Sequence, residues 1–246
     1  MKEQQQKVKT EPGTLYLIPC PIAEHENVWD VLPAANRTVI DSLDYFIVEN
    51  VRTARRFLSK AGIARKIDEL EFRELNEHTT DPREVDRMMD PILAGRSAGV
   101  ISEAGVPGVA DPGAWIVAQS HRHGVRVVPL VGPSSILLAL MASGLNGQSF
   151  AFNGYLPVKP PERAKAIRAL ERRVVQERQS QLFIEAPYRN TKLLAQLLEV
   201  CAPETRLTVA ADITGPEEYI RTRTIREWRK ASLPEIEKRP AIFILG

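Results

Sequence analysis

The sequence predicts an α/β protein of two domains, and three observations carry this prediction. The chain has 246 residues, which exceeds the usual size of a single domain. Short apolar runs alternate with amphipathic stretches, a pattern typical of parallel sheets covered by helices on both faces. A segment of turn-forming residues at 143–148 interrupts this alternation, so we expect the domain boundary between residues 146 and 147.

The first domain is expected at 14–146, after a loosely ordered polar tail at 1–13. Apolar runs bounded by turn residues predict buried strands at 15–19, 45–48, 98–101 and 125–131. The intervening stretches predict helices at 51–60, 83–93, 114–122 and 134–142. The strands alternate with the helices, which indicates a mainly parallel sheet.

The second domain is expected at 147–246 and repeats the mixture of apolar runs and helices. Strands are predicted at 149–153, 181–185, 207–211, 219–224 and 241–245. A helix is expected at 162–178, where Ile167, Leu170 and Val174 recur at helical spacing, and a leucine-rich helix at 190–200.

Composition and charge restrict the functional classes. No apolar run approaches the roughly 20 residues of a membrane span, and no signal peptide is visible, so we expect a cytoplasmic protein. The net charge of +2 combines 16 basic and 19 acidic residues in 1–146 with 17 basic and 12 acidic residues in 147–246. The basic second domain favours a polyanionic partner, although solvated helix faces give the same pattern.

Several kinds of chemistry lack their motifs. The four histidines form no i, i+4 pair with a carboxylate, and Cys20 and Cys201 lie far apart, so we expect no metal site. A phosphate-binding Gly-x4-Gly-Lys-Ser/Thr loop and a Gly-x-Ser-x-Gly nucleophile elbow are both absent.

The segment 101–113 is the strongest candidate for a ligand loop. Its three glycines and two prolines follow a predicted strand, and Glu103 and Asp111 are its only charged residues. Gly132-Pro-Ser-Ser135 follows the next predicted strand in a similar way. Ligands gather at the carboxyl ends of parallel strands, so one site could use both loops, although ordinary strand-to-helix connections have the same composition.

Six ordered motifs then identify a resemblance. The chain is similar over residues 14–246 to the class III S-adenosylmethionine-dependent methyltransferases of tetrapyrrole methylase fold, most closely their ribosomal RNA small-subunit methyltransferase I branch. The motifs are Leu15-Tyr-Leu-Ile-Pro-Cys-Pro-Ile22, Glu49-Asn-Val-Arg52, Ser102-Glu-Ala-Gly-Val-Pro-Gly-Val-Ala-Asp-Pro-Gly113, Gly132-Pro-Ser-Ser135, Phe152-Asn-Gly-Tyr-Leu-Pro157 and Glu185-Ala-Pro-Tyr-Arg189.

The resemblance implies two α/β domains with the cofactor S-adenosylmethionine in the cleft between them, a homodimer and no metal. Carried over by motif, the candidate cofactor contacts are Ile22, Glu103, Val106, Ser134, Ser135 and Ala186. The candidate catalytic residues are Glu49, Arg52, Glu185 and Arg189. Three aromatic residues of these motifs could stack on a base or on the adenine, or simply fill the core: Phe152, Tyr155 and Tyr188.

The resemblance further implies methylation of the ribose 2′-hydroxyl of a cytidine in small-subunit ribosomal RNA. Two alternatives stay open: a methyltransferase for a small molecule such as a tetrapyrrole, and a cofactor-binding paralogue without transfer activity. The second alternative arises because Asn50 and Val51 stand where the branch usually has an aspartate and a threonine. The branch also usually has a histidine where this chain has Tyr188.

Overall fold

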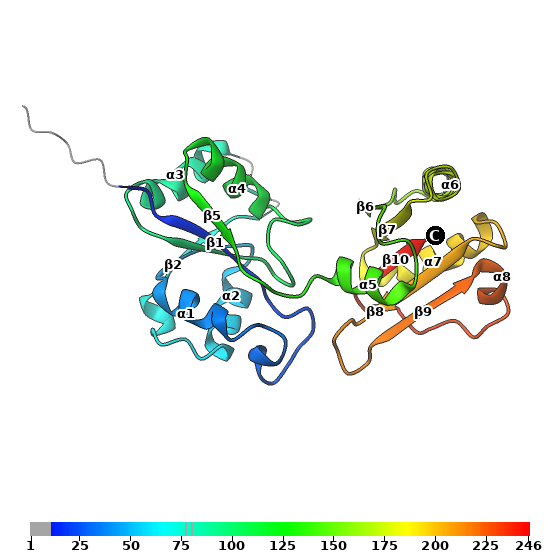
Figure 1. Cartoon of the computed structure of the whole chain (residues 1–246), viewed down its shortest axis with the longest axis horizontal. Coiled ribbons are helices and arrows are strands. Elements are labelled where there is room, and N and C mark those ends of the chain that lie inside the picture. The colour runs from blue at the N-terminus through cyan, green and yellow to red at the C-terminus, as the bar shows by residue number, and fades with distance from the viewer. Residues whose placement is uncertain (1–10, 77, 80) are drawn as a thin grey trace, which may run out of the picture. The chain divides into compact units, whose positions relative to one another are not determined.

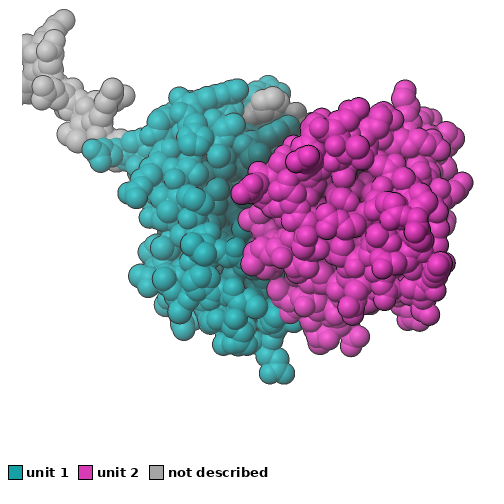
Figure 2. Space-filling model, turned by 45° about the vertical axis from the view of Figure 1, so that its right-hand side comes forward, with its two compact units in different colours: residues 1–133 teal, residues 134–246 magenta. Residues whose placement is uncertain are grey.

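The computed structural model describes residues 11–76, 78–79 and 81–246, and these divide into two compact units, the first ending at Pro133 and the second beginning at Ser134 (Figures 1 and 2). The boundary follows Pro133 instead of residue 146. Helix α5 (Ser135–Ser143) belongs to the second unit because its Ala139 and Leu140 pack in that unit's core, and Thr222 Oγ1 donates a 2.8 Å hydrogen bond to the Ser143 carbonyl. Most of the expected tail at 1–13 lies outside the described residues.

The first unit contains a five-stranded sheet whose described pairings are all parallel, in the order β3-β2-β4-β1-β5. The strands are β1 (Thr14–Ile18), β2 (Tyr45–Val48), β3 (Glu71–Glu74), β4 (Ala98–Ile101) and β5 (Arg126–Pro129). The helices are η1 (Val28–Asp30), α1 (Ala35–Ser42), α2 (Val51–Lys60), η2 (Ile67–Glu69), α3 (Pro82–Leu93) and α4 (Gly113–Arg122). The parallel α/β architecture is therefore confirmed.

Helices cover both faces of this sheet (Figure 1). Phe46 and Val48 of β2 pack with residues of α1 and α2, whereas Tyr45 and Ile47 pack with residues of α3 and α4. A strand buried on both faces needs an uninterrupted apolar sequence, which explains why β2 and β4 stand out as solid apolar runs.

The second unit contains a mixed sheet in the order β6-β7-β10-β8-β9, in which only the β6–β7 pair is parallel. The strands are β6 (Phe150–Tyr155), β7 (Ser180–Ile184), β8 (Arg206–Ala211), β9 (Tyr219–Thr224) and β10 (Ala241–Leu245). Besides α5, the helices are α6 (Pro160–Glu177), η3 (Pro187–Arg189), α7 (Asn190–Val200) and α8 (Ile225–Trp228). None of the helices in the described parts of the chain is both long and apolar enough to span a bilayer.

Alternate residues of the central strand β10 face two cores. Phe243 and Leu245 pack with α6, α7 and α8, while Ile242 and Ile244 pack with α5. The second sheet is thus also covered on both faces, and the expected two α/β domains are confirmed.

Candidate functional site

In the first unit, the loops that follow β1 and β4 are hydrogen-bonded to each other. The Cys20 amide donates to the Gly105 carbonyl at 2.8 Å, and the Gly105 amide donates to the Cys20 carbonyl at 3.1 Å. Gly105 has a φ of +71°, a conformation that side chains rarely adopt, and a Cβ there would lie 4.0 Å from Ile22 Cγ1. The structure thus brings Ile22 beside the segment 101–113, called the glycine-rich loop below.

Asp111 organises the interior of the glycine-rich loop. Its carboxylate accepts hydrogen bonds from the Gly108 amide, at 2.9 Å to both oxygens, and from the Gly113 amide at 2.7 Å. Burial raises the pKa of Asp111, and the two amide hydrogen bonds oppose that rise. The carboxylate therefore fixes the loop backbone at the start of α4.

Glu49 lies at the end of β2 and contacts the same loop. Its Oε2 accepts a 3.2 Å hydrogen bond from the amide of Glu103, whose side chain is exposed. Glu49, Ser102 and Asp111 line a cavity of about 10 Å³, which has room for one water molecule. The predicted residues Glu49 and Glu103 are therefore neighbours, and Val106 follows in the same loop, partly exposed.

Arg52 lies in the first turn of α2. Asn50 caps this helix, since its side-chain oxygen accepts from the amides of Arg52 at 2.9 Å and Thr53 at 3.2 Å. Asparagine and aspartate are comparable N-cap residues, so the exchange relative to the usual motif of the resembling branch retains a good cap at this position. The Arg52 side chain is exposed and forms no hydrogen bond or ion pair with the described residues.

The Gly132-Pro-Ser-Ser135 turn packs against the loop after β1. A Cβ at Gly132 would lie 2.3 Å from the Pro19 ring, so only glycine fits this close approach. Ser134 is the N-cap residue of α5, yet its hydroxyl makes no capping hydrogen bond. Ser134 and Ser135 are both partly exposed.

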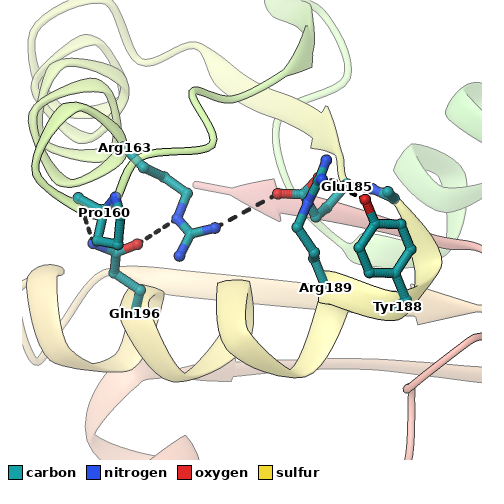
Figure 3. Close-up of polar contacts among 7 residues, drawn as sticks. Pro160, Arg163, Glu185, Tyr188, Arg189 and Gln196 are labelled. Atoms are coloured by element: carbon teal, nitrogen blue, oxygen red, sulfur yellow. Dashed lines mark hydrogen bonds and ion pairs between the residues drawn. The ribbon is translucent and has the colours of Figure 1, made fainter.

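In the second unit, Glu185 follows β7 (Figure 3). Its side chain is fully buried. Its Oε1 accepts three hydrogen bonds, from the Ala186 amide at 2.8 Å, Arg189 Nε at 2.9 Å and Arg189 Nη2 at 2.6 Å. The structure thus brings three predicted residues, Glu185, Ala186 and Arg189, into one hydrogen-bonded group.

Arg163 completes this group and was not predicted from the sequence. Its Nη1 lies 3.6 Å from Glu185 Oε2, and its Nε donates to Gln196 Oε1. Glu185 Oε2 has no hydrogen-bond partner among the described residues, and the ion pair with Arg163 supplies a positive charge beside it. Arg163 occupies the same stripe of α6 as Ile167, Leu170 and Val174, a spacing that could have revealed its burial.

The three aromatic residues of the motifs differ in how far they are buried. Phe152 packs against the core beneath α5, whereas Tyr155 and Tyr188 are 64% and 60% exposed. No group of three or more metal-ligating side chains occurs among the described residues, and Cys20 and Cys201 are buried.

Comparisons with known proteins agree with this picture. The family model for tetrapyrrole (corrin/porphyrin) methylases matches residues 29–228. The ribosomal RNA small subunit methyltransferase I of Vibrio cholerae is 32% identical over 222 residues, covering 89% of this chain and 72% of the relative. The protein of the same name from Mesorhizobium japonicum is 34% identical, covering 88% of this chain and 68% of the relative.

Solved structures show the same fold. The methyltransferase CobJ has a TM-score of 0.62 at 18% identity and matches 94% of this chain and 93% of its own. A uroporphyrin-III C-methyltransferase from Thermus thermophilus, complexed with S-adenosylhomocysteine, has a TM-score of 0.52 at 17% identity, over 95% and 97% of the two chains. The resemblance inferred from the six motifs is thereby confirmed, and the chain belongs to the tetrapyrrole methylases, a family of methyltransferases.

Proposed function

We propose that this chain transfers a methyl group from S-adenosylmethionine to small-subunit ribosomal RNA, at the ribose 2′-hydroxyl of a cytidine. The observation that carries the proposal is the similarity to proteins named ribosomal RNA small subunit methyltransferase I, which extends over both units. The tetrapyrrole methyltransferases among the solved structures share less than 25% identity with this chain and support the fold alone.

The first unit offers a cradle for the cofactor. S-adenosylmethionine supplies an already activated methyl group, so the protein mainly has to hold donor and acceptor in line and exclude water. The loops after β1 and β4 are tied together at Cys20 and Gly105, and a Cβ at Gly108 would meet nothing within 4 Å. In this proposal Ile22 and Val106 pack on the cofactor, and Glu103 attracts its positive charge.

In the second unit, the motif residues proposed as cofactor contacts are Ser134 and Ser135, at the start of α5, and Ala186. Ala186 belongs to the Glu185 group, which is Glu185, Ala186, Arg189 and Arg163. Glu185 is buried and its Oε1 already accepts three hydrogen bonds, so we assign it the role of holding Arg189 rather than that of a base. The Arg189 side chain is 23% exposed and is the member of this pair that can reach a substrate.

The substrate-facing roles in the first unit fall to Glu49 and Arg52. Glu49 lies at a strand end beside the glycine-rich loop, where a carboxylate can accept a proton from a hydroxyl group. Arg52 is exposed and without a described side-chain partner, as expected of a cation that meets phosphate. Exchange of either residue by alanine should reduce methylation of RNA.

We further propose that the chain acts in the cytoplasm as a homodimer. Leu137 and Met141 lie one turn apart on α5 and are 50% and 76% exposed, on a helix that is apolar on all sides. A second copy of the chain would cover them. Light scattering should give twice the mass of the chain, and Met141→Glu should reduce it to the monomer.

The test of the function uses purified protein, labelled S-adenosylmethionine and small ribosomal subunits from cells that lack this gene. Nuclease digestion and mass spectrometry then locate the label, and label on the ribose of one cytidine is the expected result. Absence of label while calorimetry still detects cofactor binding would overturn the assignment of the substrate. A spectral change on adding a precorrin-like substrate would favour the small-molecule alternative instead.

A further inference from the structure

Two exposed tyrosines stand at adjacent strand ends in the second unit. Tyr155 is the last residue of β6 and pairs with Ile184, the last residue of β7, and Tyr188 lies in the 3-10 turn η3 just beyond β7. Their exposed fractions of 64% and 60% are unusual for large aromatic side chains at strand ends, which normally pack into the core. Neither ring is needed to fill the core, so a different role has to account for them.

Arg189 contacts one of the two tyrosines, Tyr188. Its guanidinium carbon lies 4.9 Å from the centroid of the Tyr188 ring, and its Nη1 donates a 2.7 Å hydrogen bond to the Tyr188 hydroxyl (Figure 3). Tyr155 is placed beside this pair by the sheet, because its strand partner Ile184 directly precedes Glu185, the residue that binds Arg189. The backbone pairing therefore brings both tyrosines to the strand end that carries Arg189.

The interior of the unit holds Arg189 in place. Arg189 is bound through Nε and Nη2 to buried Glu185, Glu185 faces Arg163, and Arg163 donates to Gln196, whose Nε2 donates to the Pro160 carbonyl at 2.7 Å. Side chains anchored in this way lose little further freedom when a ligand binds. The guanidinium has five N–H donors, and the contacts to Glu185 and Tyr188 use three of them, which leaves two for a ligand.

We infer that Tyr155, Tyr188 and Arg189 form a stacking platform for an unpaired nucleotide of the RNA substrate, an inference that rests on the proposed function. Aromatic rings and guanidinium planes stack on bases splayed out of single-stranded RNA, and the free N–H donors suit a phosphate or a base edge. One carboxylate between two guanidinium groups leaves the cluster with a net positive charge, which complements the RNA backbone.

The test measures steady-state kinetics on small ribosomal subunits for Tyr155→Leu, Tyr188→Leu and the double variant. Each single exchange should raise KM for the subunits about tenfold, because stacking on one aromatic ring contributes roughly that factor, and the double exchange should raise it further. The KM for S-adenosylmethionine should not change. Tyr188→Phe keeps the ring and should raise KM less than Tyr188→Leu.

Trp115→Leu is the matched control, since Trp115 is an aromatic residue of the first unit that is 49% exposed. Melting temperatures of all variants show whether they fold. A KM for subunits equal to that of the control would overturn the platform, and a rise in the KM for the cofactor instead would place the adenine on these rings. If the wild-type protein methylates no ribosomal RNA, the proposed function itself is refuted. That result differs from the two outcomes above, in which the wild type is active and only the variants are compared.

Discussion

Arg163 Nη1 lies 3.6 Å from Glu185 Oε2 in the interior of the second unit, where the two side chains are 6% and 0% exposed. Glu185 Oε2 accepts no hydrogen bond, while Oε1 accepts three. Arg163 therefore balances the charge at Oε2, and Arg189 balances the charge at Oε1. Loss of Arg163 would leave Oε2 buried without this charged partner.

We expect Arg163→Met to destabilise the second unit by about 3 kcal/mol, because removal of one member of a buried ion pair leaves the other charge uncompensated. The free energy of unfolding in urea measures the change. The double variant Arg163→Met with Glu185→Gln should be more stable than the single variant, since the amide carries no charge. Arg172→Met, on the exposed face of the same helix, is the control and should change stability by less than about 0.5 kcal/mol.

We expect Asp111 to make the stability of the first unit depend on pH. Its pKa is raised in the folded state by burial, so the folded protein holds this proton more tightly than the unfolded chain does. Stability should therefore fall as pH rises from the ordinary carboxyl pKa, near 3.8, through the raised folded value. Asp111→Asn retains an oxygen acceptor for the Gly108 and Gly113 amides but does not titrate.

The measurement is the difference in unfolding free energy between Asp111→Asn and the wild type, at several pH values between about 4 and 7. As pH rises, the variant should become more stable relative to the wild type. Taking the difference removes the contributions of groups that titrate equally in both proteins. A difference that stays constant over the range, or shifts toward the wild type, would contradict the assigned direction of the pKa.

Strands and helices with a clear apolar pattern could be predicted from the sequence. Elements without such a pattern, or without a capping residue at their start, could not. Strands β2 and β4 are continuous apolar runs because both of their faces are buried. Strand β3 has Phe72 as its only apolar residue, since it lies at the edge of the sheet, and it was not predicted. Helix α1 was also missed, and its N-cap residue Ala34 makes no side-chain capping bond that would mark a start.

The candidate site was predictable to a similar extent. The motif at Glu185 and Arg189 is local, because the two charges of the ion pair lie only four positions apart in the sequence, and the structure shows that pair. Arg163 belongs to a distant helix that also carries exposed arginines such as Arg168, so residue type alone gave no reason to select it. The expected boundary after residue 146 differs from the structural boundary after Pro133 for a related reason. No local sequence feature shows that α5 packs on the second sheet.

We expect a side chain at Gly132 to disturb the loop after β1 in the first unit. A Cβ at this position would lie 2.3 Å from both Cβ and Cγ of Pro19, and the proline ring cannot move without its backbone. Gly132→Ala should therefore cost about 1–3 kcal/mol and displace the loop after β1. Urea denaturation measures the cost, and weaker binding of S-adenosylmethionine by calorimetry reports the displaced loop.

Gly147→Ala is the matched control for Gly132→Ala. A Cβ at Gly147 would meet no atom within 4 Å, and its backbone is not in the left-handed region. The control should leave stability and cofactor affinity close to those of the wild type. Equal effects of the two alanines would show that the approach of Gly132 to Pro19 is not the cause.

Helix α6 predicts how salt affects RNA binding. Lys165, Arg168 and Arg172 recur at helical spacing on its exposed face, and none of them forms an ion pair with the described residues. Cations that contact phosphates release counterions, and each contact to single-stranded RNA contributes roughly 0.7 to the slope of log affinity against log salt. Replacing all three by alanine should therefore reduce that slope by about 2.

The measurement is filter binding of a small-subunit RNA fragment at several salt concentrations. The control removes the same charge from the first unit by replacing Lys60, Arg65 and Lys66, which are exposed and form no described ion pair. A general effect of net charge would lower the slope equally in both triple variants. A phosphate contact at α6 lowers it only in the α6 variant, and at low salt that variant should still methylate the RNA, because none of its three residues belongs to the Glu185 group.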